Sequence, residues 1–129
     1  MRTQTLALLG GVAAVLFGVS PAFAADPNPA MYGLIGKMTS LPGKRSALAE
    51  ILKNGVAGMP GCLSYVIADD PANAELLWIT EVWTSKTAHD ASLSLPSVRE
   101  AITRGRPLIA GMETVAETAP IGGSGLDKP

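Results

Sequence analysis

Length and charge limit what this chain can be. Its 129 residues suit one small domain, and its net charge of −1, without a basic run interleaved with aromatic residues, argues against a nucleic-acid partner. A lone cysteine, Cys62, excludes an internal disulfide, and one histidine with one cysteine in separate segments does not make a tetrahedral metal site.

The first residues have the pattern of a secretory signal peptide. Arg2 supplies the positive charge, residues 6–19 form an apolar run too short to span a bilayer, and residues 22–24 form a small-x-small cleavage site. We therefore assign residues 1–24 to a signal peptide. The mature protein should be exported, either periplasmic or secreted, with no stable membrane insertion after cleavage. An uncleaved membrane anchor is the alternative.

A strand and a helix should follow. Residues 25–30 are rich in proline and form a linker, and residues 31–38 predict a strand with apolar side chains on both faces. Pro42-Gly43 marks a turn. Apolar residues then recur at the spacing of an amphipathic helix with one buried face, namely Leu48, Ile51, Leu52 and Val56.

The middle of the chain predicts a β-hairpin. One strand spans Cys62–Ala68, and another apolar run, rich in β-branched and aromatic residues, spans residues 75–83. The polar cluster between them, residues 69–73, is typical of a turn. We therefore expect the two strands to be antiparallel neighbours.

Two helices should come next. The hydroxyl of Ser85, or of the threonine before it, can cap a short helix that carries His89 and ends at Pro96. Ser97 followed by Glu100 has the form of a capping box, which predicts a second helix with an apolar stripe.

The last elements complete a recognisable order. Gly111 should break the chain before a final strand at residues 112–118, and residues 119–129 form a Gly- and Pro-rich flexible tail or an arm laid on a partner. Over residues 31–118, the order β-α-β-β-α-β predicts a ferredoxin-like α+β domain, an antiparallel sheet with helices on one face. Because the open face should also be apolar, we expect a homodimer that packs sheet to sheet.

Three segments in this order resemble the antibiotic biosynthesis monooxygenase family of dimeric α/β barrels. The resemblance covers roughly residues 31–117. Its carriers are Pro42-Gly43-Lys44 before the first helix, Met59-Pro60-Gly61-Cys62-Leu63-Ser64-Tyr65 at the second strand, and Glu81-Val82-Trp83 followed by a helix with His89 and the Leu95-Pro96-Ser97 turn.

The resemblance implies a pocket between the sheet and its helices. There a small quinol-like or polyphenolic aromatic would be oxidised by O₂, with no metal or organic cofactor. Catalytic roles are implied for Trp83, the tryptophan of the Glu-x-Trp motif, and for His89. In the family, that histidine more usually lies one helical turn later, at the position of Ser92, which shares a helix face with residue 89 and is therefore a substrate-binding candidate.

The chemistry of two residues fits these roles. An oxygenase without a cofactor must remove a phenolic proton from its substrate, and histidine is the side chain that titrates near neutral pH. His89 is the only histidine in the chain. Its alternative role is a structural one on the helix surface, where Asp90 is also expected. Trp83 can stack on the substrate or close the pocket, and its alternative role is that of a core residue.

Two further residues are candidates for substrate contact. Glu81 has the parity of residue 83, so it should be partly buried and paired, with Arg104 or Arg106 as the expected partner. Tyr65 can offer its hydroxyl to a quinol oxygen, although strand tyrosines usually only pack.

Two other functions are compatible with the same fold. The first is a non-catalytic module that binds an apolar ligand or stabilises a dimer, which the absence of the usual histidine favours. The second is a haem-binding or haem-degrading protein. The haem-degrading branch of the superfamily also uses an asparagine on the first strand, and residues 31–38 contain none.

Overall fold

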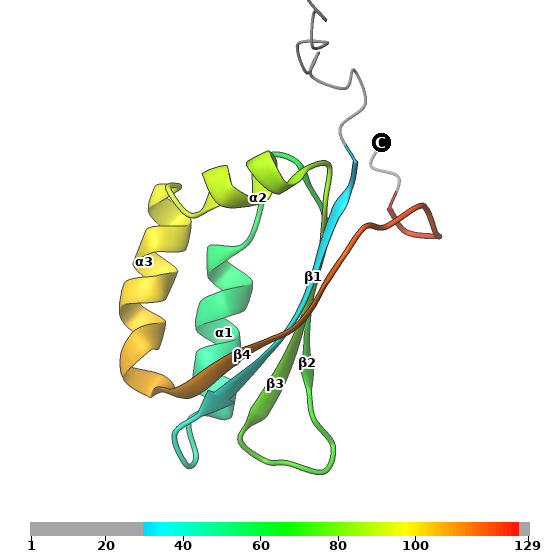
Figure 1. Ribbon diagram of the computed structural model, residues 1–129. Coiled ribbons are helices and arrows are strands. Elements are labelled where there is room, and N and C mark those ends of the chain that lie inside the picture. Colours follow the sequence, from blue (N-terminus) through cyan, green and yellow to red (C-terminus); the bar gives the residue numbers. More distant parts are fainter. Residues whose placement is uncertain (1–29, 127–129) are drawn as a thin grey trace, which may run out of the picture.

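The computed structural model describes residues 30–126, which form four strands and three α-helices (Figure 1). The predicted signal peptide and most of the predicted linker lie outside the described residues. The elements are β1 (Tyr32–Ser40), α1 (Arg45–Gly55), β2 (Cys62–Asp69), β3 (Leu76–Trp83), α2 (Lys86–Ser92), α3 (Pro96–Gly105), the 3₁₀ turn η1 (Arg106–Leu108) and β4 (Ile109–Thr118).

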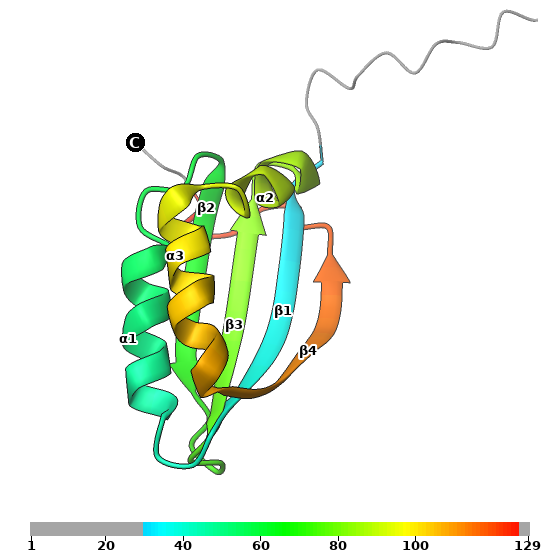
Figure 2. The same cartoon turned by 90° about the vertical axis from the view of Figure 1, so that its left-hand side faces the viewer.

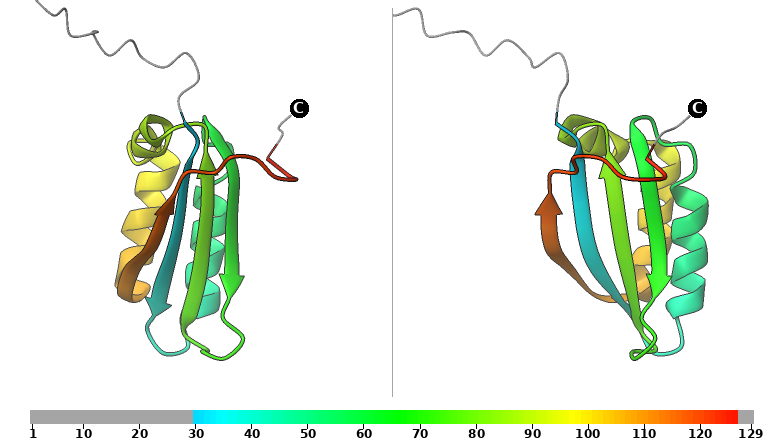
Figure 3. Two further views of the ribbon diagram at one scale, coloured as in Figure 1. Left: turned by 45° about the vertical axis from the view of Figure 1, so that its right-hand side comes forward. Right: turned by 90° about the vertical axis from the view of Figure 1, so that its right-hand side faces the viewer.

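The four strands form one antiparallel sheet in the order β2-β3-β1-β4. Helices α1 and α3 lie side by side against one face, with α2 across the end of the sheet (Figure 2). The opposite face carries no helix (Figure 3). This is the ferredoxin-like α+β fold that the element order predicted.

Alternation along β3 decides which side chains face the helices. Every second residue points to the helices and is buried, namely Leu77, Ile79, Glu81 and Trp83. The residues between them point to the open face and are less buried. Two core clusters form on the helix side. One gathers around the β3 tryptophan and contains Tyr32, Met59, Cys62 and Val98; the other gathers around Leu77 and contains Met38, Leu48 and Ile79.

Close packing of α1 on α3 depends on a glycine at the end of α1. A Cβ atom at Gly55 would lie 2.4 Å from the Cβ of Ala101, nearer than any real contact. The absent side chain therefore sets how closely the two helices approach and where the α3 residues lie above the sheet.

The capping residues predicted for α2 and α3 agree with the structure in one case and differ in the other. Ser85 caps α2, because its hydroxyl accepts a hydrogen bond from the Ala88 amide at 3.1 Å. The predicted capping box at Ser97 and Glu100 is wrong: α3 begins at Pro96, and Leu95 at the N-cap makes no side-chain bond. Proline suits the first helical position, since it lacks the amide that would need a cap.

The last strand begins earlier than predicted. Gly111 does not break the chain; it lies within β4 and pairs with Thr39 of β1. The 3₁₀ turn η1 reverses the chain instead, so β4 starts at Ile109.

Beyond β4, residues 119–126 form no helix or strand and cross the open face of the sheet near one end (Figure 3). In the described part of the chain, no helix has the length and apolar character needed to cross a membrane.

Candidate functional site

A cavity of about 320 Å³ lies between the sheet and the helices. Its walls are mainly apolar and come from both layers, with Leu34, Met38, Leu52, Ile79, Val98 and Ile102 among them. Polar side chains at the cavity include Glu81 and His89. A second space of about 290 Å³ adjoins it, because the two share walls at Met38, Leu52, Ala101, Ile102 and Met112.

His89 reaches this cavity because of where α2 begins. The Ser85 cap starts the helix directly after β3, and the imidazole four residues on turns back over the end of the sheet. The His89 side chain is 15% exposed, and its Nε2 lies 3.7 Å from Oε2 of Glu81. The structure thus brings together the histidine and the carboxylate that were singled out separately from the sequence.

Glu81 is a buried carboxylate at the cavity wall. Its residue is 7% exposed, and its Oε2 accepts a hydrogen bond from Nε1 of Trp83 at 2.8 Å. Burial raises the pKa of Glu81, while the Trp83 bond and the nearby His89 lower it to a smaller extent. Its partners are therefore these two residues rather than Arg104 or Arg106, both of which are exposed.

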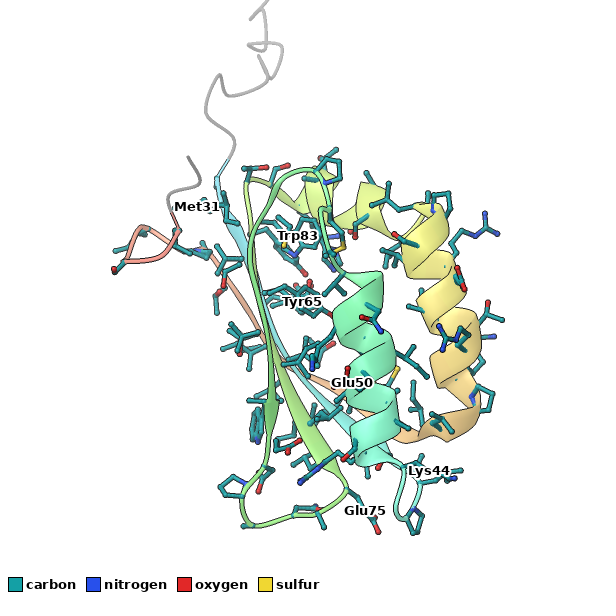
Figure 4. The ribbon with its side chains drawn as sticks, turned by 180° about the vertical axis from the view of Figure 1, so that it is seen from behind. Met31, Lys44, Glu50, Tyr65, Glu75 and Trp83 are labelled. Atoms are coloured by element: carbon teal, nitrogen blue, oxygen red, sulfur yellow. The ribbon has the colours of Figure 1, made fainter. Side chains whose placement is uncertain are left out.

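Trp83 lies behind the cavity wall. It is 1% exposed, sits in the core cluster, and is not among the residues that line the cavity. Its ring meets the His89 ring edge-on, with centroids 5.4 Å apart. Figure 4 shows Trp83 and Tyr65 on the helix side of the sheet. In this position Trp83 donates a hydrogen bond to Glu81 and contacts the His89 ring, and its own ring is not part of the cavity wall.

The other two predicted site residues lie in different places. Tyr65 lines the cavity, and burial together with the charge of Glu81 raises the pKa of its hydroxyl. Ser92 does not line this cavity. Its side chain is buried, and its hydroxyl donates a hydrogen bond to the backbone oxygen of His89 at 2.6 Å.

Two residues near the imidazole were not predicted as site residues. Oδ1 of Asp90 lies 3.0 Å from Nδ1 of His89. Tyr32 packs its ring against the imidazole, with centroids 5.1 Å apart, and its hydroxyl donates to Oε1 of Glu117 on β4 at 2.8 Å. Burial, with help from Glu117, raises the pKa of Tyr32 to about 12, so its hydroxyl stays protonated at neutral pH.

Signals for these two residues in the sequence are weak. Lys86 and Asp90 stand at the i, i+4 spacing of a helix ion pair, which the structure contains, with Nζ 2.9 Å from Oδ2. That spacing says nothing about the neighbouring imidazole. Tyr32 becomes part of the site only through the sheet register, which pairs it with Trp83.

The arrangement is suited to moving a proton at the edge of an apolar space. An ionised carboxylate only accepts hydrogen bonds, so a hydrogen bond from His89 to Asp90 requires the imidazole proton to be on Nδ1. Nε2, which points toward Glu81, is then free to act as a base. Among residues 30–126, no three His, Cys, Asp or Glu side chains are grouped so that they could hold a metal ion.

Comparisons with known proteins agree on one family. Its model, described as antibiotic biosynthesis monooxygenase, matches residues 31–104. A solved structure from Chloroflexus aurantiacus J-10-fl, named as a candidate antibiotic biosynthesis monooxygenase, shares 59% sequence identity over 75% of this chain and 99% of that one, with a TM-score of 0.73.

More distant structures share the fold. Candidate monooxygenases from Caulobacter crescentus CB15 and Nitrosomonas europaea are 17% and 13% identical, both with TM-scores of 0.66. They cover 74% and 72% of this chain, and 93% and 92% of their own chains. No curated protein matches the chain.

Proposed function

Because the chain belongs to the antibiotic biosynthesis monooxygenase family, we propose that it oxidises a small quinol-like or polyphenolic aromatic with O₂, without a cofactor. The observation that supports this most directly is the pair formed by His89 and Glu81 at the wall of an otherwise mainly apolar cavity. The cavity, at about 320 Å³, lies at the small end of the range of about 300–1,000 Å³ for small-molecule sites.

In this reaction the substrate itself is the reductant. Nε2 of His89 takes the phenolic proton, and the electron-rich anion passes an electron to O₂. The two radicals combine through a new C–O bond, and the resulting peroxide takes up a proton. Cleavage of its O–O bond leaves one oxygen atom on the ring and releases the other as water. A quinol and O₂ thus give a hydroxyquinone and water, and no further reductant is consumed.

The surroundings of the imidazole fit this step. The walls of the cavity are mainly apolar, and in such surroundings the transfer of charge is more sensitive to nearby groups than it is in water. Tyr65 lines the same cavity and keeps its proton, so its hydroxyl can donate to a quinol oxygen. The adjoining space beside Ile102 and Met112 leaves room for a substituent on the aromatic ring.

The proposal is tested by following oxygen uptake with a panel of reduced quinones and polyphenols. We expect at least one substrate to consume O₂ faster than its own autoxidation and to gain one labelled oxygen atom from ¹⁸O₂. Uptake at the autoxidation rate across the panel would favour a non-catalytic module that binds apolar ligands, which the mainly apolar cavity also supports. Binding of the same compounds, measured without turnover, then identifies that module.

We also propose that two copies pack through their open sheet faces. That face carries Trp78 and Val82 from β3, and Val66 of β2, which is 51% exposed. Burying such residues against a second copy would remove apolar surface from water.

We also propose that the protein is exported, as residues 1–24 predict. The mass of the mature chain tests this proposal.

A charge on the open face should disrupt this dimer. We expect the wild-type protein to sediment with twice the protomer mass and Val66→Lys to sediment as a single protomer. Val66 is exposed in one protomer, and in the dimer the second copy would bury a lysine at this position without a charged partner. Leu41→Lys is the matched control, since Leu41 is a similarly exposed apolar residue in the turn after β1. A wild-type protomer that sediments alone would contradict the proposal.

A further inference from the structure

The imidazole of His89 lies between two carboxylates that differ in distance and surroundings. Asp90 is within hydrogen-bond distance of Nδ1, at 3.0 Å, whereas Glu81 is 3.7 Å from Nε2, beyond a normal hydrogen bond. The Asp90 side chain is 53% exposed, and the Glu81 side chain is 8% exposed. One ring nitrogen therefore has a direct carboxylate partner on the solvent side, and the other faces the cavity wall.

We propose that Asp90 is a positioning residue for His89. Its carboxylate holds the proton on Nδ1, so that Nε2 presents its lone pair toward the cavity, and it stabilises the imidazolium that forms once Nε2 has taken a proton. This inference rests on the proposed function. It adds a residue that the family resemblance does not point to and that the sequence places on a helix surface.

Asp90 is itself held in place. Nζ of Lys86 lies 3.0 Å from Oδ1 and 2.9 Å from Oδ2 of Asp90, one helical turn away. Lys86 and His89 lower the pKa of the Asp90 carboxyl, so it is ionised at neutral pH and can only accept hydrogen bonds. Because Asp90 and Lys86 are both exposed, their ion pair adds little to the stability of the fold.

Other charged and titratable groups around the ring do not replace Asp90. Glu81 faces Nε2 from β3. Tyr32 of β1 packs on the ring, and its hydroxyl is committed to Glu117 of β4. Lys86 can only donate hydrogen bonds and so cannot accept the Nδ1 proton. If Asp90 is removed, the carboxylate that remains next to the ring faces Nε2, and the proton should move to that nitrogen.

The tautomer can be read directly, because the chain contains a single histidine. In ¹⁵N-labelled full-length protein, at a pH where the ring is neutral, we expect the two ring-nitrogen shifts to show a proton on Nδ1. In Asp90→Ala, the shifts should change toward a proton on Nε2. Thr87→Ala, an exposed change on the same helix, should leave both signals in place. Amide spectra of both variants verify the fold.

Turnover supplies a second readout. With a quinol that the wild-type protein oxidises, Asp90→Ala should lower kcat on the order of 10-fold and leave KM unchanged. This is less than the about 10⁴-fold effect of a buried carboxylate in the same role, since Asp90 is exposed to water. A wild-type ring protonated on Nε2, or equal spectra for wild type and Asp90→Ala, would overturn the inference. The spectra decide it even if no quinol is oxidised, an outcome that would overturn only the proposed function.

Discussion

Replacing His89 with alanine is expected to lower kcat/KM for quinol oxidation by about 10²–10⁴-fold, the usual contribution of a positioned general base. The imidazole lines the cavity, and its Nε2 is directed toward the buried carboxylate of Glu81. Without it, the cavity has no imidazole to accept the phenolic proton, which then has to leave directly to water. Oxygen uptake at saturating and limiting substrate measures the loss.

The matched control is again Thr87→Ala, which changes an exposed residue of the same helix and should retain full activity. Adding free imidazole to His89→Ala should restore part of the rate, because the truncated side chain leaves space beside the cavity. Unchanged turnover in His89→Ala would remove the histidine from the mechanism and leave it a structural role against Tyr32 and Trp83.

Replacing Trp83 with alanine is expected to lower the free energy of unfolding by about 3–5 kcal/mol, as for other large aromatic residues in cores. Trp83 is 1% exposed and lies at the centre of the cluster with Tyr32 and Met59. Its removal also takes away the donor that Glu81 uses. The total free energy of unfolding of a native protein is about 5–15 kcal/mol, so this single substitution should remove a large part of it. Denaturant unfolding measures it.

Trp83→Phe separates the hydrogen bond from the packing. It keeps most of the ring but leaves the Glu81 carboxylate without its indole donor, which should cost about 1–3 kcal/mol. Trp78→Phe is the matched control, because Trp78 makes the same type of bond, to Asp70 at 2.8 Å, in a less buried place. Asp70 lies in the turn between β2 and β3 and is not buried, so water can replace the donor there. A loss in Trp78→Phe as large as that in Trp83→Phe would contradict this account.

Trp83→Phe should also change how the free energy of unfolding depends on pH. The pKa of Glu81 is raised in the folded state, so between its ordinary value of 4.5 and the raised value the folded protein binds more protons than the unfolded chain. Stability therefore falls as pH rises through this window. Because the Trp83 bond lowers the pKa of Glu81, its loss in Trp83→Phe should extend the fall to higher pH. Glu81→Gln, which cannot titrate, should remove it.

Local sequence patterns predicted a helix or strand correctly where the residues of that element alone decide where it begins. The apolar run of β-branched and aromatic residues at positions 75–83 indicated β3, and Ser85 was correctly named as one of two possible caps for α2. The errors at Ser97 and Gly111 arose where two local signals competed. Proline at the first helical position was the stronger helix start, and the turn η1 reversed the chain before the glycine.

The sequence by itself determined the order of elements and the fold, because hydrophobic periodicity and turn residues act over a few neighbouring positions. The family followed from the resemblance of three short segments. Only the tertiary structure decided which polar groups meet. Tyr32 bonds to Glu117 across 85 positions of the chain, and Trp83 bonds to Glu81 and contacts the His89 ring without lining the cavity. Such contacts depend on strand register and on the angle at which α2 leaves β3. These are set by the packing of the whole domain rather than by any local segment.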